Sequence, residues 1–161
     1  MLRAAILTVS DRSAQGLRSD SSGPQLVGVL QSAGIDVPWS AVVPDDKDAI
    51  SSKLISWADE NGADLILTTG GTGLSPRDVT PEATVAVVER LVPGMAEAMR
   101  LASLRKTPHA MISRAVAGVR GRTLIINLPG SPKGALENLE AVLPALEHAI
   151  AKIQGDPSEC A

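Results

Sequence analysis

Residues 64–73, Asp-Leu-Ile-Leu-Thr-Thr-Gly-Gly-Thr-Gly, join an apolar run of strand length to a glycine-rich turn. An apolar run without polar alternation is typical of a strand that is buried on both faces of a parallel sheet. The run therefore predicts a strand over residues 64–69. The glycines after it allow the backbone to turn sharply and to approach a ligand closely. The stretch as a whole indicates a buried strand that leads into a binding loop.

On both sides of this strand, short apolar runs alternate with amphipathic stretches. This alternation predicts an α/β fold with a mostly parallel sheet, right-handed crossovers and helices on both faces. Further strands are expected at residues 4–9, 37–43 and 123–128, and helices at residues 25–33, 47–59, 80–91, 93–104 and 132–153. Gly118 and Gly121 indicate a turn, and Pro144 is expected to kink or divide the last helix.

The composition is that of a folded domain. The chain has 161 residues, of which 44% are hydrophobic and 20% are charged, without Phe or Tyr. This length fits one domain, which we place at residues 1–154, followed by a flexible tail at residues 155–161. No apolar run approaches the roughly 20 residues that span a bilayer, so we expect no membrane partner.

Cysteine content and charge exclude further classes of protein. The single cysteine, Cys160, rules out an intrachain disulfide and a cysteine-based zinc or iron–sulfur site. We therefore expect a cytoplasmic protein. The net charge of −3, with Trp39 and Trp57 as the only aromatic residues, disfavours nucleic acid as a partner.

Four polar or glycine-rich segments directly follow predicted strands. They are residues 10–12 (Ser-Asp-Arg), 44–46 (Pro-Asp-Asp), 70–73 (Gly-Gly-Thr-Gly) and 129–132 (Pro-Gly-Ser-Pro). Because the carboxyl ends of parallel strands meet at one edge of a sheet, where ligands bind, we expect these segments to gather there. An antiparallel strand would remove its loop from this group.

The segment of Gly70, Gly71, Thr72 and Gly73 is a candidate anion-binding loop. Its N–H groups can form an anion-binding concavity, to which a helix beginning at Thr80 would add its positive end. The loop matches neither a Walker A motif nor the dinucleotide fingerprint. The alternative is a plain turn between a strand and a helix.

Two carboxylates are expected at the same edge. Asp78 and Asp45 are candidate Mg²⁺ ligands, since Mg²⁺ binds few carboxylates together with water and phosphate oxygens. Alternatively, Asp78 forms an Asx turn, and Asp45 or Asp46 caps the next helix. Two carboxylates beside a phosphate site favour metal-assisted phosphoryl or nucleotidyl transfer over a simple anion site.

Other polar segments have two interpretations each. Ser131 can cap the last helix, and Lys133 can offer a point charge to a phosphate. Ser113 and Arg114 could supply a hydroxyl and a guanidinium to an anionic substrate. Seven of the 15 basic residues lie in residues 90–122, which fits either a phosphorylated ligand or a solvated surface. Residues 20–24, Asp-Ser-Ser-Gly-Pro, are interpreted as a polar turn.

An ordered set of motifs resembles one known family over nearly the whole chain. The set consists of Val-Ser-Asp-Arg at 9–12, Asp-Ser-Ser-Gly-Pro at 20–24, Val-Pro-Asp at 43–45, Thr-Thr-Gly-Gly-Thr-Gly at 68–73, Arg-Asp-Val-Thr-Pro-Glu at 77–82 and Leu-Pro-Gly-Ser-Pro-Lys-Gly at 128–134. These motifs resemble those of the molybdopterin-binding domain family of molybdenum-cofactor biosynthesis.

The resemblance implies a three-layer α/β/α fold that is usually trimeric. Members of this size include molybdopterin adenylyltransferases, which use Mg-ATP to transfer AMP to the terminal phosphate of molybdopterin and release pyrophosphate. A larger enzyme, the molybdenum insertase, then adds molybdate. The resemblance thus implies Mg²⁺ as cofactor, ATP as co-substrate, molybdopterin as substrate and a homotrimer.

The resemblance also implies roles for individual residues. Asp45 and Asp78 match the positions associated with catalysis and metal. The substrate and nucleotide positions are Ser10, Asp11, Gly70, Gly71, Thr72, Gly73, Ser113, Pro129, Gly130, Ser131 and Lys133. It leaves open which of them contact adenine and which contact pterin.

Two other functions remain as alternatives. One is a pterin-binding or carrier protein of the same fold without catalytic activity. The weaker one is a nucleotide-binding oxidoreductase, against which the missing dinucleotide fingerprint argues. The helix at 93–104 also has two interpretations, because Met95, Met99 and Ala102 on one face can pack in the core or against a sister subunit.

Overall fold

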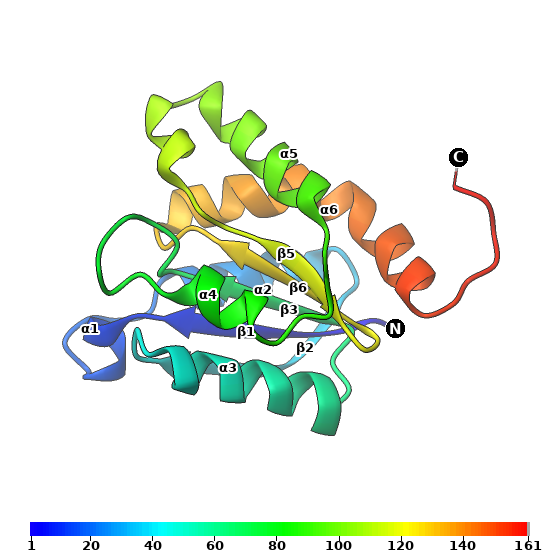
Figure 1. Ribbon diagram of the computed structural model, residues 1–161, viewed down its shortest axis with the longest axis horizontal. Helices are drawn as coiled ribbons and strands as arrows, with labels where there is room; N and C mark the ends of the chain where they lie inside the picture. The colour runs from blue at the N-terminus through cyan, green and yellow to red at the C-terminus, as the bar shows by residue number, and fades with distance from the viewer. Residues whose placement is uncertain (161) are drawn as a thin grey trace.

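A six-stranded sheet forms the centre of the structure, a computed structural model that describes residues 1–160 (Figure 1). Its strands lie in the order β2-β1-β3-β6-β5-β4. Their bounds are β1 Arg3–Val9, β2 Asp36–Val43, β3 Leu65–Thr69, β4 Arg90–Leu91, β5 Ala117–Arg120 and β6 Thr123–Leu128. The pairs β2–β1, β1–β3 and β3–β6 are parallel. Strand β5 pairs antiparallel with both β6 and β4. The prediction of a mostly parallel sheet is confirmed.

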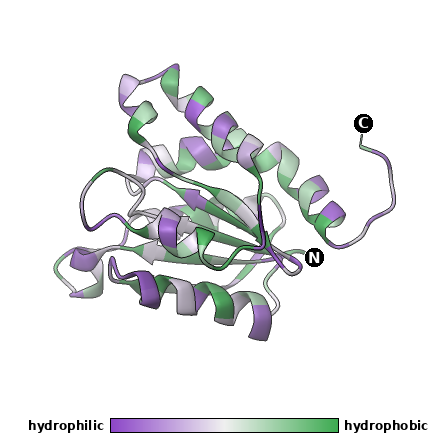
Figure 2. Cartoon of the chain, in the orientation of Figure 1, coloured by the Kyte–Doolittle hydropathy of each residue, from purple (hydrophilic) through white to green (hydrophobic). Residues whose placement is uncertain are grey.

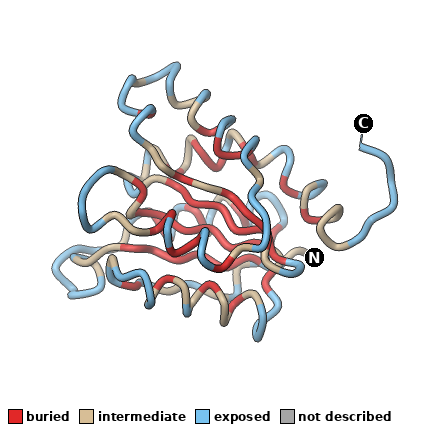
Figure 3. Tube along the Cα trace, in the orientation of Figure 1, coloured by how far each residue is buried: buried red, intermediate tan, exposed pale blue. Residues whose placement is uncertain are grey.

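The register of the central strands explains why residues 65–69 are apolar without alternation. Leu67 lies between Ile6 of β1 and Ile126 of β6, and all three side chains face one core cluster. The next residue on the amino side, Ile66, faces the other cluster. The strand is therefore covered on both faces, as the buried centre in Figure 3 shows.

Helices cover both faces of the sheet, which gives the expected three layers. On one face lie α2 (Ser22–Ser32), α5 (Pro93–Leu104) and α6 (Pro132–Ile153); on the other lie α3 (Lys47–Ile55) and α4 (Thr80–Val85). Three short segments complete the chain: α1 (Asp11–Ala14), the π-helical turn η1 (Ser56–Glu60) and the 3-10 turn η2 (Pro108–Ile112). The apolar colouring of the strands in Figure 2 follows from this double coverage.

Aliphatic side chains and methionine build most of the core. Leu26, Leu139 and Met99, from the three helices of one face, are all at most 1% exposed. Met95 and Met99 belong to this core, which favours core packing over subunit contact for that face of α5. Among the described residues, no helix has the length and apolarity required to cross a membrane.

The predicted helix over residues 80–91 is wrong in its second half. Helix α4 ends at Val85, and the chain then forms the short strand β4. The Glu89 N–H donates a hydrogen bond to the Val119 carbonyl at 2.8 Å, so pairing with β5 replaces helical hydrogen bonds. A strand of two residues carries no periodic signal from which it could be predicted.

Gly118 lies inside β5 rather than in a turn, and only Gly121, with φ +54°, forms the predicted turn. A Cβ atom on Gly118 would lie 2.8 Å from Val88 Cγ1 and 2.9 Å from the Arg90 carbonyl oxygen. The glycine is therefore required by the close approach of β4, not by a change of chain direction.

Three helix predictions need smaller corrections. Helix α2 begins at Ser22 rather than at residue 25, and α3 ends at Ile55, where η1 continues to Glu60. Helix α6 is not divided at Pro144. Pro144 is exposed, so water can satisfy the carbonyl that its missing N–H leaves free. The tail predicted at 155–161 is exposed up to Cys160, and residue 161 lies outside the described residues.

Two glycine substitutions should change stability in opposite directions. Gly118→Ala should lower the free energy of unfolding by about 1–3 kcal/mol, because the new methyl group meets Val88 and Arg90. Gly28→Ala, in the middle of α2 with no heavy atom within 4 Å, should raise it by about 0.5–1 kcal/mol through helix propensity. Urea unfolding of both variants measures the difference, and equal effects would contradict the close approach at β4.

Candidate functional site

The four loops predicted to gather at one edge of the sheet do so, at the carboxyl ends of β1, β2, β3 and β6 (left in Figure 1). Backbone hydrogen bonds join them in pairs. The Ser10 N–H donates to the Val43 carbonyl at 2.9 Å, and the Gly70 N–H donates to the Leu128 carbonyl at 3.1 Å. The fold thus brings together segments that are up to about 120 residues apart.

The glycine loop after β3 has a backbone that other residues cannot adopt without strain. Gly70 and Gly71 have φ values of +104° and +68°. A Cβ atom on Gly70 would collide with the Val9 carbonyl, and one on Gly71 would collide with Thr80 Oγ1. Thr80 fixes the turn, since its hydroxyl donates to the Gly70 carbonyl at 2.9 Å and its N–H donates to the Gly71 carbonyl at 3.1 Å.

This turn leaves backbone donors available for an anion. Within residues 1–160, the N–H groups of Gly71, Thr72 and Gly73 donate no hydrogen bond to the protein. Consecutive free N–H groups in a tight turn form a concavity of positive potential. The structure therefore supports the anion-binding interpretation of the loop over that of a plain turn.

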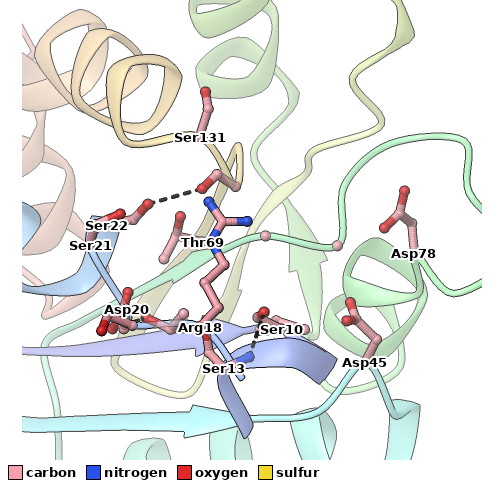
Figure 4. Close-up of a pocket in the computed structure, with 16 residues that line it drawn as sticks. Ser10, Ser13, Arg18, Asp20, Ser21, Ser22, Asp45, Thr69, Asp78 and Ser131 are labelled. Carbon is pink, nitrogen blue, oxygen red and sulfur yellow. Dashed lines mark hydrogen bonds between the residues drawn. The ribbon is translucent and has the colours of Figure 1, made fainter. Parts of the chain in front are cut away.

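The two predicted carboxylates lie against this loop. Asp45 Oδ1 is 3.1 Å from the position of a Cβ on Gly71, and Asp78 Oδ2 is 2.9 Å from that of a Cβ on Gly73. One oxygen of each is occupied: Asp45 Oδ2 accepts the Asp11 N–H at 2.9 Å, and Asp78 Oδ2 accepts the Ser75 N–H at 3.0 Å. The Oδ1 atoms accept no hydrogen bond from residues 1–160, and Figure 4 shows both carboxylates at the same end of the site.

The environment of Asp45 disfavours its charged form. Partial burial raises the pKa of the Asp45 carboxyl, the negative charges of Asp11 and Asp78 raise it further, and the Asp11 N–H opposes them. By contrast, hydrogen bonds from Arg77 hold the pKa of Asp11 below its ordinary value. A cation beside Asp45 and Asp78 would relieve this unfavourable charge.

These groups fit Mg²⁺ that arrives with a phosphate ligand. Among the described residues, no three His, Cys, Asp or Glu side chains form a complete metal site. Mg²⁺ characteristically takes one or two carboxylates and completes its coordination with water and substrate phosphates. The free Oδ1 atoms of Asp45 and Asp78 provide this limited set of ligands beside a loop that can bind phosphate.

Two cavities flank the glycine loop. The first, of about 320 Å³, extends from Asp45 and Asp78 to the amino end of α2, as Figure 4 shows. The second, of about 420 Å³, is lined by residues of α5, η2 and α6, among them Ser103, Ile112 and Asn138. Both have volumes typical of small-molecule sites. Residues common to the two cavities are Gly71, Asp78, Gly130 and Ser131.

Most residues predicted for the site line one of these cavities. Ser10, Asp45, Asp78, Gly70, Gly71, Gly130 and Ser131 line the first cavity. Thr72, Gly73, Ser113 and Pro129 line the second. Asp11 and Lys133 line neither: Asp11 pairs with Arg77 at 2.9 Å, and Lys133 is exposed.

Helix capping, the alternative role considered for Ser131 and for Asp45 or Asp46, applies to Ser131 and Asp46. Ser131 Oγ accepts the Gly134 N–H at 3.1 Å and caps α6, although Ser131 also lines both cavities. At the start of α3 the cap is Asp46, whose Oδ1 accepts the Ala49 N–H at 2.8 Å. Asp45 is therefore not needed as a cap, and its carboxylate is free to face the glycine loop.

Arg114 does not offer its guanidinium to a substrate in this structure. Its Nε and Nη2 atoms donate to the carbonyls of Gly73 and Asp78, each at 2.8 Å, and Nη1 pairs with Glu82. It therefore braces the loop that carries Asp78. Other basic residues within residues 90–122 also form ion pairs, including Arg120 with Asp59 and Lys106 with Glu137.

The segment interpreted as a polar turn, residues 20–24, includes the start of α2 at Ser22, and its residues 20–22 form one wall of the first cavity. Asp20 Oδ2 accepts the Thr8 hydroxyl at 2.7 Å, and the Ser22 hydroxyl donates to the Gly130 carbonyl at 2.9 Å. Arg18 is the one basic side chain among the described residues that line this cavity, and no motif indicated it. The signal available in the sequence was the match of residues 20–24 to the family motif, since this segment leads into α2.

Comparison with known proteins identifies the family of this fold. The sequence pattern of the family described as "probable molybdopterin binding domain" matches residues 5–148. A crystal structure of the molybdopterin biosynthesis enzyme MoaB from Thermus thermophilus is 56% identical and has a TM-score of 0.92. The alignment covers 99% of this chain and 100% of that one.

Two curated relatives differ in length. A molybdopterin adenylyltransferase from Helicobacter pylori strain 26695 is 42% identical over 96% of this chain and 89% of its own length. Gephyrin from Dictyostelium discoideum is 46% identical over 94% of this chain. The chain spans only 22% of the length of that gephyrin.

The raised pKa of Asp45 predicts that Asp45→Asn stabilises the chain at neutral pH. A folded chain that raises this pKa holds the proton more tightly than the unfolded chain does, so the ionised carboxylate opposes folding. The melting temperature of Asp45→Asn should exceed that of the unmodified chain at pH 7.5. The difference should shrink as the pH falls through the raised pKa toward 3.8. A lower melting temperature at pH 7.5 would contradict this, and Asp36→Asn, at the exposed start of β2, is the control.

Proposed function

Because the chain belongs to the family of probable molybdopterin binding domains, we propose that it is a molybdopterin adenylyltransferase of molybdenum-cofactor biosynthesis. In this proposal the chain transfers AMP from Mg-ATP to the terminal phosphate of molybdopterin. The single observation that carries the proposal is the position of Asp45 and Asp78 beside the free N–H groups of the glycine loop.

The proposed reaction exchanges one phosphoanhydride bond for another. An oxygen of the molybdopterin phosphate attacks the α-phosphorus of ATP, and the bond from that phosphorus to the bridging oxygen of the β-phosphate breaks. Pyrophosphate leaves with the bonding electrons. The reacting groups are all anionic, so the protein must mainly position them and offset their charge.

The chain has separate groups for these two tasks. The free N–H groups of Gly71, Thr72 and Gly73 would hold phosphate oxygens, and they need no reorganisation, because Thr80 already fixes the turn. Asp45 and Asp78 would hold Mg²⁺, whose positive charge would offset the negative charge of the phosphates and make them more electrophilic.

The pair of cavities fits a reaction with two substrates. Gly71, Asp78, Gly130 and Ser131 border both cavities, so a phosphate group from each side would meet at these residues. In this proposal the nucleotide and the pterin occupy different cavities, and transfer occurs at the shared border.

Three further proposals follow from the sequence resemblance rather than from the geometry. We propose a cytoplasmic location, a homotrimer, and delivery of the adenylylated product to a molybdenum insertase. The exposed apolar side chains of α5, Leu101 and Leu104, would be available to contact another subunit.

Asp78→Asn tests the role of this carboxylate in turnover. The amide oxygen can still accept the Ser75 N–H, so the loop should remain folded while the charged ligand is lost. We expect pterin-dependent pyrophosphate release from Mg-ATP to fall by about 100-fold or more. Mass detection of the adenylylated pterin identifies the product.

Asp48→Asn, on the exposed first turn of α3, is the matched control and should retain turnover. Pterin binding by the unmodified chain without pyrophosphate release would instead support a carrier protein without catalytic activity. Near-normal turnover by folded Asp78→Asn would exclude an essential role for the Asp78 carboxylate.

A further inference from the structure

One ion pair links the loop that carries Asp78 to the loop after β1, which in turn is bonded to Asp45. Arg77 lies next to Asp78 in the sequence, and its side chain crosses to the loop after β1. Its Nε atom donates to Asp11 Oδ2 and its Nη2 atom donates to Asp11 Oδ1, each at 2.9 Å. The pair is therefore bidentate, the geometry in which a guanidinium fixes both distance and orientation.

Asp11 is in turn locked to Asp45. The Asp11 N–H donates to Asp45 Oδ2, and the Asp45 N–H donates to Asp11 Oδ1, each at 2.9 Å. Each residue thus binds the carboxylate of the other through its backbone. A continuous path of four hydrogen bonds runs from Asp45 through Asp11 to Arg77, which directly precedes Asp78.

No other side chain among the described residues makes this connection. Arg114 braces the Asp78 loop from the opposite side, but its partners are Gly73, Asp78 and Glu82, all within that loop or the helix after it. Among the described residues, the Arg77–Asp11 pair makes the only side-chain hydrogen bonds between the Asp78 loop and the loop after β1, and Asp11 continues them to Asp45.

Folding stability does not explain the pair. The side chains of Arg77 and Asp11 are 64% and 30% exposed, and ion pairs this exposed contribute little to stability. Holding two long side chains in one arrangement also costs conformational entropy. An effect on the relative position of Asp45 and Asp78 accounts for the arrangement better than an effect on stability.

We infer that Arg77 is a positioning residue for the metal–nucleotide site, since through Asp11 it holds the Asp78 loop in register with Asp45. This inference rests on the proposed function, in which both carboxylates share one Mg²⁺. The hydrogen bonds of the Arg77 side chain go to Asp11 rather than to Asp45 or Asp78, and Arg77 lines neither cavity.

The test measures metal binding rather than turnover. The probe is Mn²⁺, titrated in the presence of α,β-methylene ATP and followed by electron paramagnetic resonance. Arg77→Gln should raise the dissociation constant for Mn²⁺ by about tenfold, the scale of losing a group that orients a metal ligand. Its melting temperature should stay close to that of the unmodified chain, because the pair is exposed.

Further variants separate positioning from charge. Arg77→Lys keeps the charge but cannot bind both oxygens of Asp11 in the same plane. Its affinity for Mn²⁺ should therefore lie between those of Arg77→Gln and the unmodified chain. The double variant Asp11→Asn with Arg77→Gln should bind Mn²⁺ as Arg77→Gln does, because the two residues act as one unit. Arg12→Gln removes an unpaired exposed charge next to Asp11 and should have less than a twofold effect.

Hydrogen exchange reports on the loop without any ligand. The amides of Ser75 and Asp78, which donate hydrogen bonds within the loop at 3.0 and 2.9 Å, should exchange faster in Arg77→Gln than in Arg12→Gln, while the core strands stay unchanged. Equal Mn²⁺ affinity and equal exchange in these two variants would overturn the inference. If the unmodified chain binds no Mn²⁺ with the nucleotide analogue, the proposed function itself is contradicted, and the inference falls with it.

Discussion

The backbone of Gly70 and Gly71 is the constraint on which the site depends. Both residues have positive φ, and both lie so close to neighbouring atoms that neither position has room for a side chain. This turn packs Gly70 against the end of β1 and leaves the N–H groups of residues 71–73 without a hydrogen-bond acceptor among the described residues. If either residue carried a Cβ atom, the loop would have to move away from Val9 or Thr80. The phosphate-binding edge would then lose its shape.

The parallel sheet places the other loops of the site beside this glycine turn. Because β1, β2, β3 and β6 run parallel, their following loops share one edge. Asp45, from the loop after β2, lies against the glycine loop, and so does Asp78, which is in the same connection as the glycines and 33 positions after Asp45. Partial burial, together with the nearby charges of Asp11 and Asp78, raises the pKa of Asp45, and a cation there would relieve this cost. Such unfavourable electrostatics is typical of functional sites.

The sequence predicted the parts of the fold that have a strong local signal. The strand over residues 123–128 has the predicted bounds, because its six side chains are all buried and apolar or paired. Strands β4 and β5 were missed, since β4 has two residues and Gly118 resembled a turn residue. The motifs located the loops of the site, with Ser10, Ser113 and Ser131 at its cavities. The partners of individual side chains could not be predicted from the sequence. Arg77 and Asp11 are 66 positions apart, and no local pattern shows that Arg114 binds the carbonyl of Gly73 rather than a substrate.

The central claim is that Asp45, Asp78 and the glycine loop together bind a metal–nucleotide complex. A crystal structure of the chain with Mn²⁺ and α,β-methylene ATP, with anomalous scattering to locate the metal, tests it most directly. The account predicts one Mn²⁺ peak in contact with Asp45 Oδ1 and Asp78 Oδ1, with phosphate oxygens at the N–H groups of residues 71–73. A nucleotide bound elsewhere, or a metal that touches neither carboxylate, would contradict the account.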